Sequence, residues 1–446
     1  MAESETQVDF TAPQIAYQEN KEGSATLEEG KHSDLPSSSQ DEFPEGGLAA
    51  WVTAIGSFLV IFCTLGYSLS FGVYQDFYSR RYLTNETSST ISWIGSLSAF
   101  IVAAGGIVSG SLYDRGYFYH LIIAGSLLQS FSLFMLSLAK PNQYYQIFLT
   151  QGVGSGIAIG LLYVPSMAVI THHFRRKRTL VMTFVASGAS LGSIIFPIML
   201  NNLLNGNVGF AYGVRASAGL ISGLLLIACL CMRTRLDPPT KPVNYIVAAR
   251  KCIRDVPFIL MLIGGFLFMP GFYYPIYFFQ LDAIKHGVSV TFSFYSLVIL
   301  NASNFVGRVT SGYIAVFAGV INLTIVATIS CSVLNFGMIG LNSLVSVVVL
   351  GVFYGYLSGV YAALVAPLIT TLTPDLSELG ARMGITAFFV GGIGVLIGAP
   401  ISGALLTSKY IWWIPAVFSG TISLTGGMVY IVMRLMFIRR QIKNQA

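Results

Sequence analysis

The chain has 446 residues, of which 54% are hydrophobic and only 10% are charged, and its mean hydropathy is +0.70. Because soluble domains carry about 25% charged residues, this composition excludes a soluble globular protein and indicates a membrane protein with several spans. The net charge of +6 hides a split, since residues 1–45 hold eleven acidic residues and only two lysines. The basic excess of the remainder lies in loops, which indicates membrane topology and argues against a nucleic-acid partner.

The N-terminal segment, residues 1–45, is polar and rich in Glu, Ser and Gln. Such a composition buries too little apolar surface to fold, so we predict a disordered cytoplasmic tail. The five cysteines of the chain have neither the spacing of a metal site nor that of a disulfide framework. We therefore expect no metal ion and no cofactor.

Twelve apolar stretches follow the tail, each of about 20 residues, the length that crosses a bilayer as a helix. Their predicted starts lie near Ala50, Ser89, Phe118, Tyr144, Thr179, Gly209, Val256, Ser289, Val316, Ser343, Ala381 and Ile411. A charged cytoplasmic connection, residues 232–255, divides them into an N-terminal half, 46–231, and a C-terminal half, 256–438. The expected fold is an all-α membrane protein with twelve transmembrane helices in two six-helix halves, followed by a short cytoplasmic tail, 439–446.

Lys and Arg concentrate in alternate loops, and this asymmetry predicts the orientation. Arg115, the run Arg175–Arg178 and the basic residues of the central connection fall on one side, which we predict to be cytoplasmic together with both termini. Asn85 lies on the other side and begins a sequon for N-glycosylation, although an unused sequon is equally expected. The plasma membrane is the expected location, with the vacuolar membrane as the alternative.

The two halves repeat the same small residues at nearly constant spacing. Gly152, Gly156 and Gly160 match Gly351, Gly355 and Gly359 at an offset of 199, Ser109-Gly110 matches Ser311-Gly312 at 202, and Gly188 and Pro197 match Gly391 and Pro400 at 203. A single Gly-x-x-x-Gly often serves packing alone. The ordered set indicates a duplicated six-helix unit, which is typical of transporters.

Arg308 is the most unusual residue of the apolar stretches, because no Asp or Glu occurs between Asp282 and Asp375. At helical spacing, Asn301, Asn304 and Ser311 fall on the same face as Arg308 and form a polar stripe. A cation at membrane depth costs about 2.5–3.5 kcal/mol on insertion scales unless it faces the protein interior. The stripe therefore suggests a site for an anion. The alternative is that Arg308 reaches the inner interface or braces a gate.

Between the second and third stretches, Gly110, Asp114 and Arg115 form the pattern Gly, three residues, Asp-Arg. This loop is similar to a motif of the major facilitator superfamily, which the chain resembles. The resemblance implies a conformational latch, in which the carboxylate of Asp114 lies near a helix N-terminus and a basic residue. The usual trailing basic residues are missing, and Val316 takes the acidic position in the second half. A solvated pair of loop residues is the alternative.

Within the superfamily, the chain resembles the monocarboxylate transporter family, and most closely its fungal branch. Two segments carry the resemblance, Glu45–Trp51 at the first span and Phe174–Gly192 at the fifth. Animal members have an acid four residues before the arginine of the eighth span, where this chain has Asn304, and a lysine in the first span, where this chain has no charge. The usual proton-carrying groups are therefore not evident, and both proton coupling and uniport stay open.

In the fold that the resemblance implies, spans one, four, seven and ten line a cavity near the midplane. Besides Arg308, Asn304 and Asn301, the candidate binding residues are Tyr67 and Ser68 on span one, Tyr163 on span four, Tyr273 and Tyr277 on span seven, and Tyr361 on span ten. Tyrosines can stack on a planar substrate and hydrogen-bond it, although near a span end they serve more often as interfacial anchors. Pro270 and Pro275 predict a bend in span seven.

We therefore predict a secondary active or facilitative transporter of a small organic anion, monocarboxylate-like, or of an aromatic, weakly acidic metabolite, working by alternating access. One alternative is an exporter of a fungal secondary metabolite, and another, from a different class, is a non-transporting membrane sensor. No catalytic constellation and no ATP-binding motif is evident, so we do not expect an enzyme. The expected partners of this monomeric protein are a small-molecule substrate, with or without a proton, and the lipid bilayer.

Overall fold

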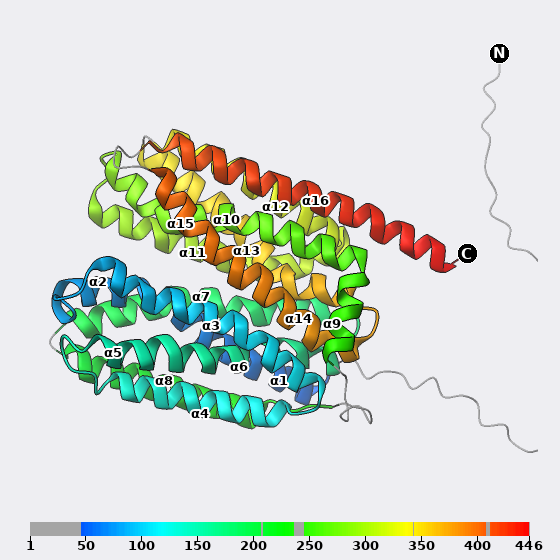
Figure 1. Cartoon of the computed structure of the whole chain (residues 1–446), viewed down its shortest axis with the longest axis horizontal. Coiled ribbons are helices and arrows are strands. Elements are labelled where there is room, and N and C mark those ends of the chain that lie inside the picture. Colours follow the sequence, from blue (N-terminus) through cyan, green and yellow to red (C-terminus); the bar gives the residue numbers. More distant parts are fainter. Residues whose placement is uncertain (1–45, 207, 236–244, 342, 407–410, 446) are drawn as a thin grey trace, which may run out of the picture. The chain divides into compact units, whose positions relative to one another are not determined.

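Figure 1 shows the computed structural model, which describes residues 46–445 apart from 207, 236–244, 342 and 407–410. The predicted disordered tail, residues 1–45, lies outside the described residues. Every regular element in the described part of the chain is helical, and ten helices there are long and apolar enough to cross a membrane.

The N-terminal half contains eight α-helices, of which several join end to end through π-helical turns to make one membrane span. They are α1 Leu48–Ile61, α2 Phe71–Phe77, α3 Ser88–Asp114, α4 Phe118–Leu136, α5 Tyr144–Ile147, α6 Ser155–Ala168, α7 Arg178–Asn205 and α8 Gly209–Cys231. The π-helical turns Phe62–Gly66 and Phe148–Gly154 continue α1 and α5, respectively.

The central connection contains one helix, and the C-terminal half follows it. These helices are α9 Tyr245–Arg254, α10 Val256–Lys285, α11 Val290–Ala318, α12 Val320–Gly337, α13 Leu344–Leu372, α14 Leu379–Thr386, α15 Val395–Leu406 and α16 Trp413–Gln445. The π-helical turn Ala387–Gly394 joins α14 to α15. In Figure 1, α1–α8 (blue to green) and α10–α16 (green to red) form two groups of roughly parallel helices.

Three details differ from the sequence-based expectation. The ninth span begins at Val320 rather than near Val316, because Gly319 takes a positive φ of 79° and ends α11 after Ala318. The central connection, which was expected only as a loop, contains the amphipathic helix α9. The predicted C-terminal tail is not a separate segment, since α16 continues through it to Gln445.

The two halves touch at equivalent positions of the repeat. At Gly110 of α3, a side chain would collide with the backbone carbonyl of Gly380 in α14. At Gly312 of α11, it would collide with Thr183 and Leu180 of α7. Both glycines come from the Ser-Gly pairs that the offset of 202 matched. The close approach of α3 to α14 and of α11 to α7 thus explains why the duplicated unit has a glycine there.

Candidate functional site

The polar stripe of α11 lies where this helix contacts α7 of the other half. The guanidinium of Arg308 is half-buried; its Nε donates to Asn304 Oδ1 at 3.0 Å, and its Nη1 donates to the Ala186 carbonyl oxygen at 2.9 Å. Asn304 is buried and also accepts from Ser190 Oγ at 2.6 Å. It donates to Ser358 Oγ of α13 at 3.0 Å. These hydrogen bonds join both halves through one network.

The charge of Arg308 meets only neutral oxygens in this network. No carboxylate forms an ion pair with it within the described ranges, and its Nη2 donates to none of the described acceptors. A guanidinium presents five N–H donors in a planar fork, which suits a carboxylate or another planar anion. The arrangement can therefore accept an anionic group without displacing an ion pair.

Aromatic side chains surround this cation. Tyr163 of α6 and Tyr273 of α10 are half-buried and interact electrostatically with Arg308. Tyr277 stacks on Tyr273, with ring centroids 5.5 Å apart and planes inclined by 23°. Asn301 accepts a long hydrogen bond from Ser193 Oγ at 3.4 Å on the same stripe. Six of the nine predicted binding residues, Arg308, Asn304, Asn301, Tyr163, Tyr273 and Tyr277, thus come together.

The other three predicted binding residues form no hydrogen bond with the Arg308 network among the described residues, although Tyr361 interacts electrostatically with Tyr273. Tyr67 is buried in its own half, where its hydroxyl bonds that of Tyr74 at 2.5 Å. Tyr361 is buried in the second half, where its hydroxyl bonds that of Tyr430 at 3.1 Å. Ser68 is half-buried and makes no hydrogen bond to the described residues.

The latch motif joins the halves near α9. The carboxylate of Asp114, at the end of α3, accepts from the Gly380 N–H at 2.8 Å and from the Ala381 N–H at 2.7 Å. Both donors lie in the first turn of α14, where backbone N–H groups lack partners within the helix. Arg115 is exposed and forms no ion pair with the described residues. The carboxylate therefore faces the positive end of a helix. Its ion pair with a basic residue is not seen among the described residues, so the latch stays a prediction.

Asp114→Ala is expected to weaken the joined state of the halves by at least about 10-fold, because two charge-assisted hydrogen bonds are lost and each contributes about 1.5–3 kcal/mol. The measurement is the alkylation rate of a cysteine introduced at Ser190, which is buried between the halves. A cysteine at Ser126, buried within the first half, is the control and should stay unreactive. Equal rates at position 190 with and without Asp114 would contradict the latch.

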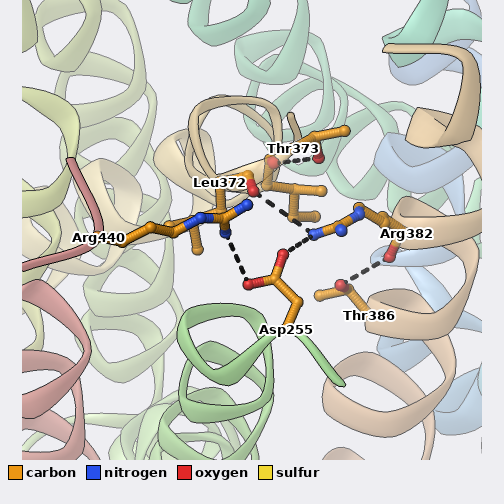
Figure 2. Close-up of polar contacts among 7 residues, drawn as sticks. Asp255, Leu372, Thr373, Arg382, Thr386 and Arg440 are labelled. Carbon is orange, nitrogen blue, oxygen red and sulfur yellow. Dashed lines mark hydrogen bonds and ion pairs between the residues drawn. The ribbon is translucent and has the colours of Figure 1, made fainter. Parts of the chain in front are cut away.

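A second charged cluster lies on the other side of α14, and sequence reasoning missed it. Figure 2 shows Asp255 between two arginines, with Arg382 Nη1 at 2.8 Å and Arg440 Nη1 at 3.0 Å. The side chains of Arg382 and Asp255 are only 3% and 7% exposed, and that of Arg440 is 40% exposed. The guanidinium of Arg382 also lies over the Phe258 ring at 4.8 Å. The cluster ties α14 to the start of α10 and to the end of α16.

Beside this cluster, α9 contacts the turn before α14. Lys251 Nζ donates to Glu378 Oε1 at 2.5 Å, and this hydrogen bond raises the pKa of Lys251. A pocket of about 670 Å³ opens here. It is lined by the basic side chains of Lys251, Arg254, Arg382, Arg439 and Arg440 and by the acidic side chains of Asp255, Asp375 and Glu378. Arg308 does not line it, so the pocket belongs to the ion-pair cluster and not to the anion site.

The comparisons with known proteins agree with this arrangement. A family model described as Major Facilitator Superfamily matches residues 47–355. The aspyridones efflux protein apdF of Emericella nidulans is 34% identical over 87% of this chain and 78% of that protein. The fujikurins efflux protein of Gibberella fujikuroi is 35% identical over 92% of this chain and 88% of that protein.

Among solved structures, the major facilitator transporter FucP in its outward conformation superposes with a TM-score of 0.69. Its sequence is 14% identical, and the match covers 86% of this chain and 98% of that one. A likeness at this identity establishes the fold, so the predicted all-α major facilitator fold is confirmed. The family match and the similar relatives, together with the duplicated helices, show that the chain belongs to the major facilitator superfamily of membrane transporters.

Proposed function

We propose that this chain exports a small secondary metabolite that is an organic anion or an aromatic weak acid, by alternating access of its two halves. The observation that carries the proposal is the half-buried guanidinium of Arg308 between the halves, beside Tyr163 and Tyr273. Within the described part of the chain it forms no ion pair with a carboxylate. Only an anionic or strongly polar partner offsets the cost of such a charge when water is excluded.

The direction of transport is proposed from the relatives. Three of them are named as efflux proteins, for aspyridones, fujikurins and agnestins. The last is from Paecilomyces divaricatus and is 34% identical over 90% of this chain and 91% of that protein. Their names favour export over the uptake of a monocarboxylate. We therefore take the resemblance to monocarboxylate-transporter motifs as a sign of common ancestry, and we propose the substrate class from the efflux relatives.

The placement in the membrane is part of the proposal. Basic residues concentrate at the end that carries α9, which supports a cytoplasmic position for this end and for both termini. Asn85 is exposed in the loop before α3, on the opposite side, where a glycan could attach. The plasma membrane suits an exporter, because a compound that crosses it leaves the cell.

The test compares where metabolites accumulate. The gene is deleted from the cell that encodes it, and untargeted mass spectrometry measures compounds in the cells and in the medium. We expect at least one acidic compound to accumulate inside and to fall in the medium after deletion, with the native chain restoring both levels. Depletion of a compound from the medium only in cells that contain the chain would instead show uptake and overturn the proposed direction.

A further inference from the structure

A buried carboxylate lies at the end of α10 farthest from α9. Asp282 is 0% exposed, and neither oxygen of its carboxylate has a hydrogen-bond donor within the part of the chain that the structure describes. His286, one turn later, places Nδ1 2.8 Å from Asp282 Oδ1 and 3.1 Å from the Asp282 carbonyl oxygen. The ring thus bonds the backbone and lies within ion-pair distance of the carboxylate. Helix α10, which corresponds to the expected span near Val256, extends to Lys285 and so includes Asp282.

The charged groups near this carboxylate are few. On α10 they are His286 and Lys285, and the hydroxyl of Tyr274 also interacts with Asp282 electrostatically. Several elements pack against α10. Helices α12, α13 and α15 and the turn Ala387–Gly394 carry no charged residue, and the basic residues of α9 lie at the opposite end of α10, next to its first residue. The first charged residues along α11 and α16 are Arg308 and Arg434. They lie roughly 27 and 31 Å along their helix axes from the first residues of these helices. Among the described residues, His286 is therefore the cation within ion-pair distance of this carboxylate.

His286 also offers a route to water. Its side chain is 29% exposed, whereas that of Asp282 is fully enclosed. An ionised carboxylate in such a place is costly unless a cation or a proton accompanies it. In this conformation the pair must hold a proton, either on the imidazole as an ion pair or on the carboxylate itself. Loss of that proton would leave a buried negative charge alone.

The segment that carries the pair is separated from the rest of α10 by a proline. Pro275 has no N–H to donate to the Gly271 carbonyl oxygen. Asn335 Nδ2 of α12 donates to this oxygen instead, at 3.1 Å. The hydroxyl of Tyr354 of α13 lies 3.3 Å from it and donates mainly to the neighbouring Phe272 carbonyl oxygen, at 2.6 Å. The freed carbonyl is thus satisfied without the helical bond, so the segment after Pro275 can tilt at a low energetic cost.

This segment has two functional faces. Tyr273, just before Pro275, interacts electrostatically with Arg308, and Tyr277 of the segment stacks on Tyr273. Asp282 lies about two and a half turns after Tyr273, on the opposite side of the helix. A movement of the segment would therefore act on the aromatic pair and on the carboxylate together.

We propose that Asp282 and His286 form a proton-binding site, and that the proton is exchanged with water when the segment after Pro275 moves. The site binds its proton more tightly in the conformation described here than in one that exposes Asp282. By linkage, acid conditions favour the present conformation and alkaline conditions the other. With the proposed orientation the site exchanges its proton with the outer face, so the pH outside would set the balance between the conformations of the exporter; this last step rests on the proposed function.

Infrared difference spectroscopy tests the proton site without any transported compound. Spectra of the full chain in lipid vesicles are recorded between alkaline and acid pH, where a protonated carboxylic acid gives a C=O stretching band. We expect one such band to be absent in Asp282→Asn and to appear at higher pH in His286→Gln, which lacks the cation that favours the ionised carboxylate. Asp76→Asn is the matched control, since Asp76 is exposed and paired with Arg80 at 2.6 Å.

Alkylation of the cysteine introduced at Ser190 tests the conformational step. Acid pH should slow its alkylation several-fold in the native background and should have no such effect in Asp282→Asn. If the infrared band persists in Asp282→Asn, the proton site is overturned. A band that disappears without any change in the pH dependence of alkylation overturns the exchange by movement. Neither result depends on the exported metabolite, so both are independent of the proposed function.

Discussion

Arg308→Ala is expected to lower the export rate of the acidic metabolite by about 10- to 150-fold. The variant removes the charged donor of the site, and a hydrogen bond to a charged group contributes about 1.5–3 kcal/mol. The fold should tolerate the change. Arg308 is half-buried, and of its two acceptors Ala186 is a helical carbonyl while Asn304 keeps its bonds to Ser190 and Ser358. The measurement is the initial efflux rate from vesicles loaded with the compound that the deletion experiment identifies.

Arg308→Lys is the matched variant. Lysine keeps the positive charge but loses the planar fork, so it should retain part of the rate if charge alone is needed and little of it if two parallel hydrogen bonds hold the substrate. Ser193→Ala is the control, because the Ser193 hydroxyl donates to the Ser190 carbonyl oxygen of its own helix at 2.8 Å and makes only a long bond to the stripe, at Asn301. Efflux at the native rate in Arg308→Ala, with native amounts of folded protein, would show that Arg308 does not bind the metabolite.

Much of the fold could be predicted from the sequence, since bilayer thickness imposes a minimum length of apolar sequence on every span. The duplicated glycines also predicted which helices correspond, because two backbones that touch leave no room for a side chain. Gly110 against Gly380 and Gly312 against Leu180 show this directly. The sequence did not predict helix α9, because the many charged residues of this connection indicated a loop. Its Lys251 and Arg254 face a pocket instead, while Val247 and Ile253 on the same helix remain exposed.

The part of the site that lies on a single helix could also be predicted. Arg308 and Asn304 are four residues apart on one helix, so their proximity follows from helical periodicity. The contact of Asp255 with Arg382 spans more than a hundred residues and has no local pattern. Arg382 did leave a signal, as a lone arginine in the apolar stretch that begins near Ala381. The burial of Asp282 could not be predicted, because it depends on how far α10 extends beyond the apolar stretch.

Asp255→Ala is expected to destabilise the folded protein by about 3–5 kcal/mol, the largest stability effect of any single substitution proposed for the chain. The side chain of Arg382 is 3% exposed, and its guanidinium loses its carboxylate partner in the variant. Removing one member of a buried ion pair leaves an uncompensated charge in a medium that solvates it poorly. The variant should therefore lose its monodisperse form in detergent at a markedly lower temperature than the native chain.

Two further variants separate the buried pair from the exposed one. Arg440→Ala removes the other partner of Asp255, but this side chain is 40% exposed, so the expected loss is only about 0–1 kcal/mol. The double variant Asp255→Ala/Arg382→Met removes both buried charges and replaces Arg382 with an apolar side chain of similar length over Phe258. It should recover most of the lost stability, because an apolar pair in a buried position is often as stable as the ion pair it replaces. A double variant no more stable than Asp255→Ala would mean that Asp255 acts through backbone geometry at the start of α10, and not through the charge of Arg382.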